Sequence, residues 1–545
     1  MRNCVSRLRI FHSGMKPFDR SGDVPHMSEG VTRAAEHFDA GRRAEALEIF
    51  RASVDAGEPG VSGYSLFGSM LFDHGEYSLA ATAYAQILAS DPECTIAHYN
   101  LGLCQASLDD WHAAERSFRR AADGNAALGE PRLALAVAQL HNARPHEALL
   151  TIETFLCSDP ANELAHLCKS TALHQLGRQT EALQGYRKVL SSNPHSVDAL
   201  ANLLCIFREM GDRDAVRSYG PMLLEVEPDS GIALESMASA YFAEENFAAA
   251  ISYVQALTTL DPSRYEHWFN LGLAHHSLGN LQEAAHAYEK ATQLRGVSSR
   301  AHVNLGTVRF DLGDLHGAKR SFETALDIEG PEPSLLWNLG AVFARLDDPE
   351  QAERIYSRIP EDAPQWPNAQ MQLGNLAFQR GDYGVAAGRF EACAHRLPDC
   401  GDAWCNAGIA YALLGDTGQA RRHFQEALAL TPGSHEALRG LADLAVGEED
   451  YDTAYDRYCD LLESGDCSPE CRYNLGLVCQ QRGLLEDAVA FYQEALQDKP
   501  DFTDALINLG YALLSLGEEQ AARGCWQQAI RQRPELGPDL EAAIA

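Results

Sequence analysis

The sequence predicts an all-α solenoid of about fifteen helix hairpins, each 34 residues long. Three observations support this prediction. A motif close to A-x-x-N-L-G recurs every 34 residues, a glycine follows it seven residues later, and an alanine and an aromatic residue follow at fixed distances. Self-similarity at one fixed period is typical of repeat architectures, in which a single unit cannot bury its own apolar face.

The units follow one another without insertion from residue 27 to residue 536. Residues 1–26 lack the pattern, and we expect either a disordered leader or a true start codon at Met27. Residues 537–545 are expected to form a C-terminal capping segment, with a short helix from Asp539 to Ile544. The units start at residues 27, 61, 95, 129, 163, 197, 231, 265, 299, 333, 367, 401, 435, 469 and 503.

The residue types at four positions of the unit are expected to determine how each hairpin turns and packs. Position 15 is glycine in ten units, which favours positive φ where the first helix ends. Glycine at position 8, such as Gly408, is expected to face the alanine of position 20, such as Ala420, and to let the two helices approach closely. Aromatic residues at position 24 are expected to fill the space between hairpins. Proline at position 32, as in Pro432, ends the second helix.

In the units at 129–162, 163–196 and 231–264, the small residues Ala136, Ser170 and Ala238 replace the first glycine, and two more units depart from the pattern in other ways. The unit at 197–230 has Leu204 at position 8 and carries Gly220 and Pro221 in its second helix. Because proline removes a helical hydrogen bond, we expect a kink there or a late helix start near Ser218. In the unit at 333–366, the second helix is expected to stop by Ile359 because prolines follow it.

The repeat resembles the tetratricopeptide repeat, for which a 34-residue unit is characteristic. This resemblance implies a right-handed superhelix whose first helices line a concave groove. It also implies a non-enzymatic scaffold for protein–protein interaction. The array is similar to the repeat region of O-linked N-acetylglucosamine transferases, but it lacks their catalytic domain.

Asparagine recurs at position 6 although it is a mediocre helix former. By resemblance this position faces the groove, where a carboxamide offers a donor and an acceptor to an extended peptide. The alternative is that these amides bond within their own array. The candidate groove residues are Asn100, Asn202, Asn270, Asn304, Asn338, Gln372, Asn406, Asn474 and Asn508.

Charge and composition argue against several classes of partner and chemistry. The net charge of −33 disfavours nucleic acid and anionic lipid and favours a basic protein segment, and no apolar run is long enough to cross a membrane. The 14 cysteines show no disulfide spacing, which indicates a reducing, cytoplasmic location. No catalytic residues, cofactor site or metal site are predicted, and histidines such as His267 and His275 are interpreted as structural.

The function predicted from these observations is a scaffold that binds a segment of a partner protein in its groove. Two alternatives stay open. The array could be the targeting subunit of a protein glycosyltransferase whose catalytic domain another polypeptide supplies. It could also be a structural scaffold that assembles with itself through its end repeats. A clamp for C-terminal carboxylates is disfavoured because the groove lacks the basic residues that such a clamp needs.

Overall fold

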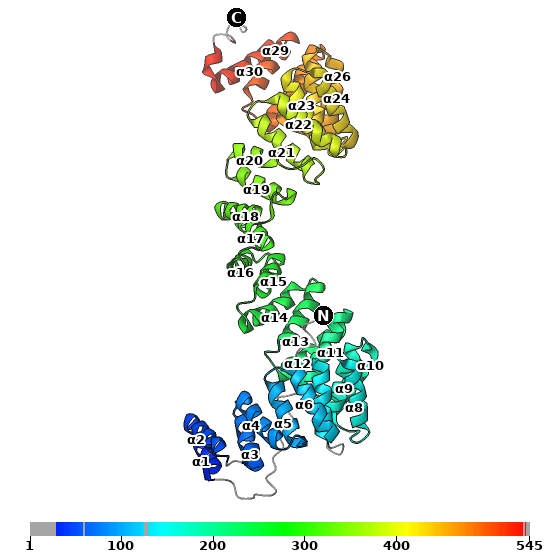
Figure 1. Ribbon diagram of the computed structural model, residues 1–545. Coiled ribbons are helices and arrows are strands. Elements are labelled where there is room, and N and C mark those ends of the chain that lie inside the picture. The colour runs from blue at the N-terminus through cyan, green and yellow to red at the C-terminus, as the bar shows by residue number, and fades with distance from the viewer. Residues whose placement is uncertain (1–28, 58–59, 125–128, 538–539, 541–545) are drawn as a thin grey trace. The chain divides into compact units, whose positions relative to one another are not determined.

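The computed structural model describes residues 29–57, 60–124, 129–537 and 540. The described residues are folded as thirty α-helices and one short 3₁₀ helix, with no strand among them (Figure 1). The leader at 1–26 and most of the capping segment at 537–545 lie outside the described residues. No described helix combines the length and apolarity that spanning a bilayer requires.

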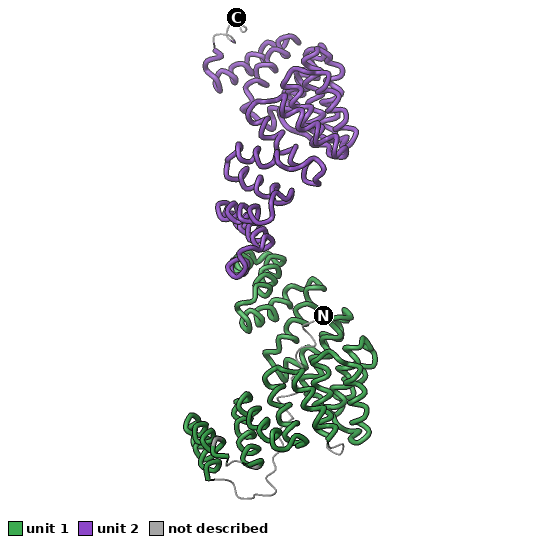
Figure 2. Tube along the Cα trace, in the orientation of Figure 1, with its two compact units in different colours: residues 1–287 green, residues 288–545 purple. Residues whose placement is uncertain are grey.

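The chain divides into two compact units, residues 1–287 and residues 288–545 (Figure 2). The first unit contains seven complete hairpins followed by α15, and the boundary falls within α16 (Leu281–Leu294). Its helices are α1 (Glu29–Asp39), α2 (Arg43–Asp55), α3 (Gly60–Asp73), α4 (Tyr77–Ser90), α5 (Thr95–Ser107), α6 (Trp111–Gly124), α7 (Gly129–His141), α8 (Pro145–Leu156), α9 (Glu163–Gln175), α10 (Gln179–Ser192), α11 (Val197–Met210), α12 (Arg213–Val226), α13 (Gly231–Ala243), α14 (Phe247–Leu260) and α15 (Tyr265–Ser277).

The second unit contains seven more hairpins. In each of them the odd-numbered helix comes first and its even-numbered neighbour packs back against it. The helices are α17 (Ser299–Asp311), α18 (Leu315–Glu329), α19 (Pro333–Arg345), α20 (Pro349–Tyr356), α21 (Trp366–Gln379), α22 (Tyr383–Arg396), α23 (Gly401–Leu414), α24 (Thr417–Leu430), α25 (His435–Gly447), α26 (Tyr451–Glu463), α27 (Pro469–Gln481), α28 (Leu485–Asp498), α29 (Thr503–Ser515) and α30 (Glu519–Gln532), before η2 (Pro534–Leu536).

The turn inside every hairpin uses a left-handed residue at position 15. All fifteen have φ between 56° and 82°, and ten of them are glycine, as the sequence predicted. The other five, among them Asp109 and Glu449, adopt the same conformation despite their side chains. The conformation is therefore a requirement of the turn, and glycine is its least strained solution.

The packing of the hairpins corrects one expectation about the glycines at position 8. A Cβ added to Gly408 would lie 2.7 Å from the ring of Phe424, which stands at position 24 of the same hairpin. The side chain nearest to the glycine is thus the aromatic ring and not Ala420. The same ring also reaches the next hairpin, because a Cβ on Gly440 would lie 2.4 Å from it.

For the two irregular units, the early helix end is confirmed and the late helix start is wrong, while a kink at Pro221 stays a prediction. Helix α20 ends at Tyr356, before Ile359, as predicted. Helix α12 does not start late: it begins at Arg213, where the Asp212 side chain accepts a hydrogen bond from the backbone of Ala215, and it runs through Pro221. An N-cap of this kind fixes a helix start well upstream of the proline.

Apolar packing forms clusters that each span several consecutive helices. In the first unit one buried cluster extends from Tyr99 in α5 to Met237 in α13. At the end of the second unit, Leu540 is 3% exposed and packs in a cluster with Leu509 and Trp526. The rest of the expected capping helix lies outside the described residues. Each hairpin thus buries its apolar face against its neighbours, as stacking of repeats requires.

Candidate functional site

The residues at repeat position 6 all lie on first helices of hairpins. Their exposure differs widely: Asn100 in α5 is fully buried, whereas Asn270 in α15 is exposed. The other seven are partly buried. They are Asn202 in α11, Asn304 in α17, Asn338 in α19, Gln372 in α21, Asn406 in α23, Asn474 in α27 and Asn508 in α29.

Four of these amides bond to a side chain of the preceding hairpin. The partners are Tyr288 Oη for Asn304 at 3.2 Å, Met371 Sδ for Asn406 at 3.7 Å, Tyr458 Oη for Asn474, and Tyr473 Oη for Asn508 at 2.8 Å. The aromatic residue of position 24 is the partner in two cases, so position 6 lies where consecutive hairpins meet. A structural reason for asparagine therefore exists at these four sites.

Four other side chains at position 6 make no hydrogen bond within the described residues. They are Asn202, Asn270, Asn338 and Gln372. A carboxamide has two donor hydrogens and an acceptor oxygen, and each loses free energy if it is buried without a partner. These four amides are therefore the ones that retain hydrogen-bonding capacity for another molecule.

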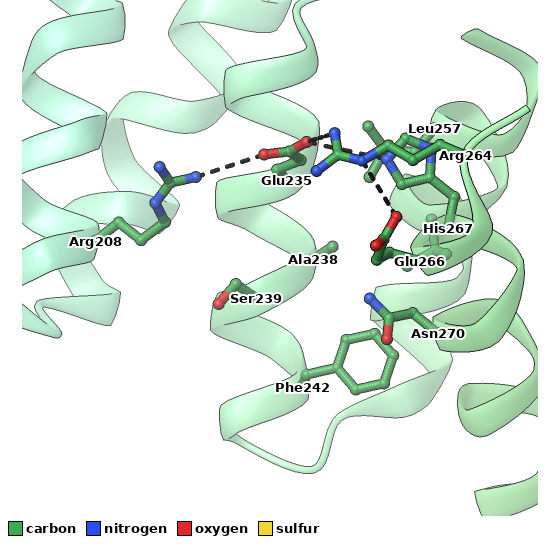
Figure 3. Close-up of a pocket in the computed structure, with 11 residues that line it drawn as sticks. Arg208, Glu235, Ala238, Ser239, Phe242, Leu257, Arg264, Glu266, His267 and Asn270 are labelled. Carbon is green, nitrogen blue, oxygen red and sulfur yellow. Dashed lines mark hydrogen bonds and ion pairs between the residues drawn. The ribbon is translucent and has the colours of Figure 1, made fainter. Parts of the chain in front are cut away.

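Asn270 lines a pocket of about 460 Å³ in the first unit (Figure 3). Three successive first helices, α11, α13 and α15, supply most of its wall, and α14 and Arg264, which directly precedes α15, supply the rest. Helices α11 and α13 pack directly against each other, and the lining of the pocket adds residues of α15. The polar groups of the pocket therefore come from three hairpins.

Glu235 is at the centre of the charged groups around this pocket. Its Oε1 accepts a hydrogen bond from Arg264 Nη1 at 2.6 Å, and its Oε2 lies 3.7 Å from Arg208 Nη1. Glu266 lies 3.7 Å from Arg264 Nε, too far for a hydrogen bond. Two guanidinium groups and two carboxylates thus surround the pocket in a partly exposed setting, where such pairs add little to stability.

The imidazole of His267 lines the same pocket and is only 5% exposed. Neither of its ring nitrogens has a hydrogen-bond partner, and Nε2 lies 3.9 Å from Glu235 Oε1. A buried ring nitrogen without a partner is uncommon and costs free energy. The sequence interpretation of His267 as a satisfied structural residue is therefore not matched by its surroundings.

A second pocket, of about 300 Å³, lies in the second unit and differs in chemistry. Gln372, Asn375 and Gln379 follow one another along one face of α21 and line it, and no charged side chain does so. Tyr356 also contributes, and burial raises the pKa of its hydroxyl to about 12, so the hydroxyl remains a donor at neutral pH. This pocket presents neutral donors and acceptors.

The remaining candidate chemistry is sparse. Within the described residues, no group of three or more His, Cys, Asp or Glu side chains is placed to hold a metal ion. The thirteen described cysteines are free thiols, and burial raises the pKa of Cys168 to about 12, which keeps that thiol protonated and unreactive.

Comparison with known families identifies the repeat. Models of the tetratricopeptide repeat match residues 65–128, 236–298, 371–435 and 439–501, residues 309–376, and residues 504–535. These matches cover more than half of the chain. The chain belongs to the tetratricopeptide-repeat family. Both pockets described above are therefore lined by first helices of tetratricopeptide repeats.

Individual relatives share only parts of the array. Human tetratricopeptide repeat protein 34 is 28% identical over 201 residues, which are 33% of this chain and 35% of that protein. Human protein O-mannosyl-transferase TMTC1 is 23% identical over 198 residues, 33% of this chain and 22% of that protein. The chain thus spans about a third or less of the length of these relatives. The solved structure of YrrB, a tetratricopeptide-repeat protein with an unusual peptide-binding site, is 25% identical, with a TM-score of 0.31, and the match covers 34% of this chain and 96% of that one.

Sequence reasoning placed Asn270 among the candidates but missed Arg208, Glu235 and Arg264. Glu235 lies in the unit at 231–264, where Ser236 replaces the asparagine of the tetratricopeptide pattern. Helix α12 separates Arg208 from Glu235 along the chain, and helix α14 separates Glu235 from Arg264. A search for opposite charges at the ends of adjacent first helices would have found this group.

Proposed function

We propose that this chain is a protein-interaction scaffold that holds a segment of a partner protein along its first helices. The observation that carries the proposal is the set of unbonded carboxamides at one repeat position, Asn202, Asn270, Asn338 and Gln372. Two of them line pockets, which gives a partner room to reach them.

The chemistry of the carboxamide suits the main chain of an extended peptide. A peptide unit carries one N–H and one C=O, and a carboxamide can accept from the first and donate to the second. Each such hydrogen bond contributes only ~0.5–1.5 kcal/mol net, so useful affinity needs several repeats together. The proposal contains no catalytic step and no cofactor. It places the chain in the cytoplasm, where the free thiols would stay reduced.

The test uses the full chain and a display library of random peptides about twelve residues long, which reach roughly 40 Å when extended. One variant combines Asn338→Ala with Gln372→Ala, two amides without partners in the second unit. Peptides selected on that face should bind this variant roughly fivefold to a hundredfold more weakly, because two hydrogen bonds of ~0.5–1.5 kcal/mol are lost.

A matched control combines Asn304→Ala with Asn508→Ala, whose amides already bond to Tyr288 and Tyr473. This control should lose local stability while it keeps peptide affinity. If the library yields no peptide that competes for the first-helix face, or if both variants bind equally well, the asparagines are structural and the proposal is wrong.

A second candidate function rests on the partial similarity to a protein O-mannosyl-transferase. In this alternative the chain is the targeting subunit of a glycosyltransferase and delivers a substrate protein to a separate catalytic chain. Purification from its native cell should then yield a complex that transfers sugar to protein. A third alternative, self-assembly, predicts a particle mass well above that of one chain in multi-angle light scattering.

A further inference from the structure

The pocket between α11, α13 and α15 has an apolar floor beneath its charged rim. Ala238, Val254 and Leu257 are 6%, 1% and 3% exposed, and the partly buried Phe242 closes one side. A floor of this kind cannot pair with a small ion. It suits a long side chain that has an apolar stem and a polar end.

The hydrogen-bonding capacity left at the rim is mostly that of acceptors on one side. Glu266 is 57% exposed and makes no hydrogen bond, and Asn270, one helical turn further along α15, makes none either. Figure 3 shows both side chains on the same side of the pocket, opposite Arg208 and Ser239. Three carboxylate and carboxamide oxygens are thus available to donors of a ligand.

His267 is an independent indication that a ligand belongs here. Its ring is nine-tenths buried in the pocket wall, and both nitrogens lack a hydrogen bond in the described structure. The unprotonated nitrogen of a neutral imidazole is an acceptor. Like the oxygens of Glu266 and Asn270, the acceptor nitrogen of this ring therefore has no hydrogen-bond donor as its partner.

The charge balance favours a cation over an anion. Arg264 already donates to Glu235, whereas Glu266 has only a distant ion pair. The whole chain carries a net charge of −33, which attracts cations and repels anions. A carboxylate entering the pocket would meet Glu266 at the rim and would have to compete with Glu235 for Arg208 and Arg264.

Resting on the proposed function, we infer that this pocket takes a lysine or arginine side chain of the bound partner segment. The aliphatic stem lies on Ala238, Leu257 and Phe242, and the charged end donates hydrogen bonds to Glu266 and Asn270. The pocket thereby selects partner segments that have a basic residue at one position. Elsewhere, carboxamides would hold the main chain without reading its sequence.

The experiment selects peptides from the same random library on the full chain and compares Glu266→Gln with Glu283→Gln. Glu283 is an exposed residue of α16 outside the pocket, so the control makes the same change of charge. Selected peptides should share a lysine or arginine at one position. Their dissociation constants should rise roughly tenfold to a hundredfold on Glu266→Gln and stay within about twofold on Glu283→Gln. Replacing the shared lysine by norleucine on the unmodified chain should produce the same loss.

The outcomes separate this inference from the proposed function. Absence of any peptide that competes for the first-helix face overturns both. Selected peptides without a shared basic residue, or with equal affinity for Glu266→Gln and the unmodified chain, overturn the inference and leave the scaffold function standing. A shared acidic residue whose binding depends on Arg208 would mean that the pocket takes a carboxylate, which also overturns it.

Discussion

The hairpins α11–α12 and α23–α24 solve the same packing problem in opposite ways. In α23–α24, Gly408 at position 8 makes room for the ring of Phe424 at position 24. In α11–α12 the large and small residues are exchanged: Leu204 stands at position 8, fully buried, and Gly220 stands at position 24. A Cβ on Gly220 would lie 2.4 Å from Met237 Sδ in α13, so this glycine also admits a side chain of the next hairpin.

The comparison teaches that a larger residue at position 8 can be offset by a smaller residue at position 24. Five other hairpins lack the first glycine. Two of them follow the same rule because they have smaller residues at position 24, in the pairs Ala136 with Ile152 and Ala238 with Val254, whereas the other three keep an aromatic ring there. Interiors at crystal-like density tolerate such exchanges when the total volume is kept.

Periodicity and the glycine of position 15 were enough to predict the hairpins and their turns, and the prolines that follow Ile359 predicted the early end of α20. Which side chain meets Gly408 could not be predicted, because both Ala420 and Phe424 lie on helix faces that the period makes equally plausible. The start of α12 was wrong because Pro221 was weighed without the Asp212 cap upstream. The rim of the charged pocket joins residues of three hairpins, and only the stacking of α11, α13 and α15 brings them together.

The largest expected effect comes from placing a large side chain at position 8 of the regular hairpin, α23–α24. Gly408→Leu should destabilise α23–α24 by at least ~2 kcal/mol, because the new side chain collides with the Phe424 ring. The double variant Gly408→Leu/Phe424→Gly copies the arrangement of α11–α12. It should be more stable than the sum of its single variants predicts by ~1–3 kcal/mol.

The measurement is hydrogen exchange of the α23–α24 amides, read by mass spectrometry on the full chain, since stability in a repeat array is local. The reciprocal pair Leu204→Gly and Gly220→Phe in α11–α12 serves as the control and should show a coupling of the same sign. If the stability changes of the single variants add up to that of the double variant in both hairpins, positions 8 and 24 do not fill one shared volume.

A smaller effect should come from removing the proline of the exchanged hairpin. Pro221 lies inside α12 and is exposed, and it cannot donate the helical hydrogen bond that the Arg217 carbonyl would accept. Pro221→Ala should therefore stabilise α12 by up to ~3 kcal/mol and slow exchange of its amides. In the unmodified chain, amides of α12 should exchange faster than those of α24. Exchange that is equally slow in both helices would show that α12 already accommodates the proline without cost.

The smallest effect is expected in α9–α10, one of the three hairpins that lack the first glycine and still keep an aromatic ring at position 24. Here Ser170 replaces the glycine of position 8 while Tyr186 keeps an aromatic ring at position 24. The compensation lies one residue earlier, at Gly185, where an added Cβ would lie 2.1 Å from Ser170 Oγ. Gly185→Ala should cost less than ~1 kcal/mol, because the helix gains roughly that much from alanine while the serine must leave its hydrogen bond to the His166 carbonyl.

The exchanged variant Ser170→Gly/Gly185→Ala restores the usual small residue at position 8 and should match the unmodified chain in hydrogen exchange of α9 and α10. If instead the exchange costs more than the single substitution, these two positions are not a compensating pair, and the volume rule holds only where position 24 itself is reduced.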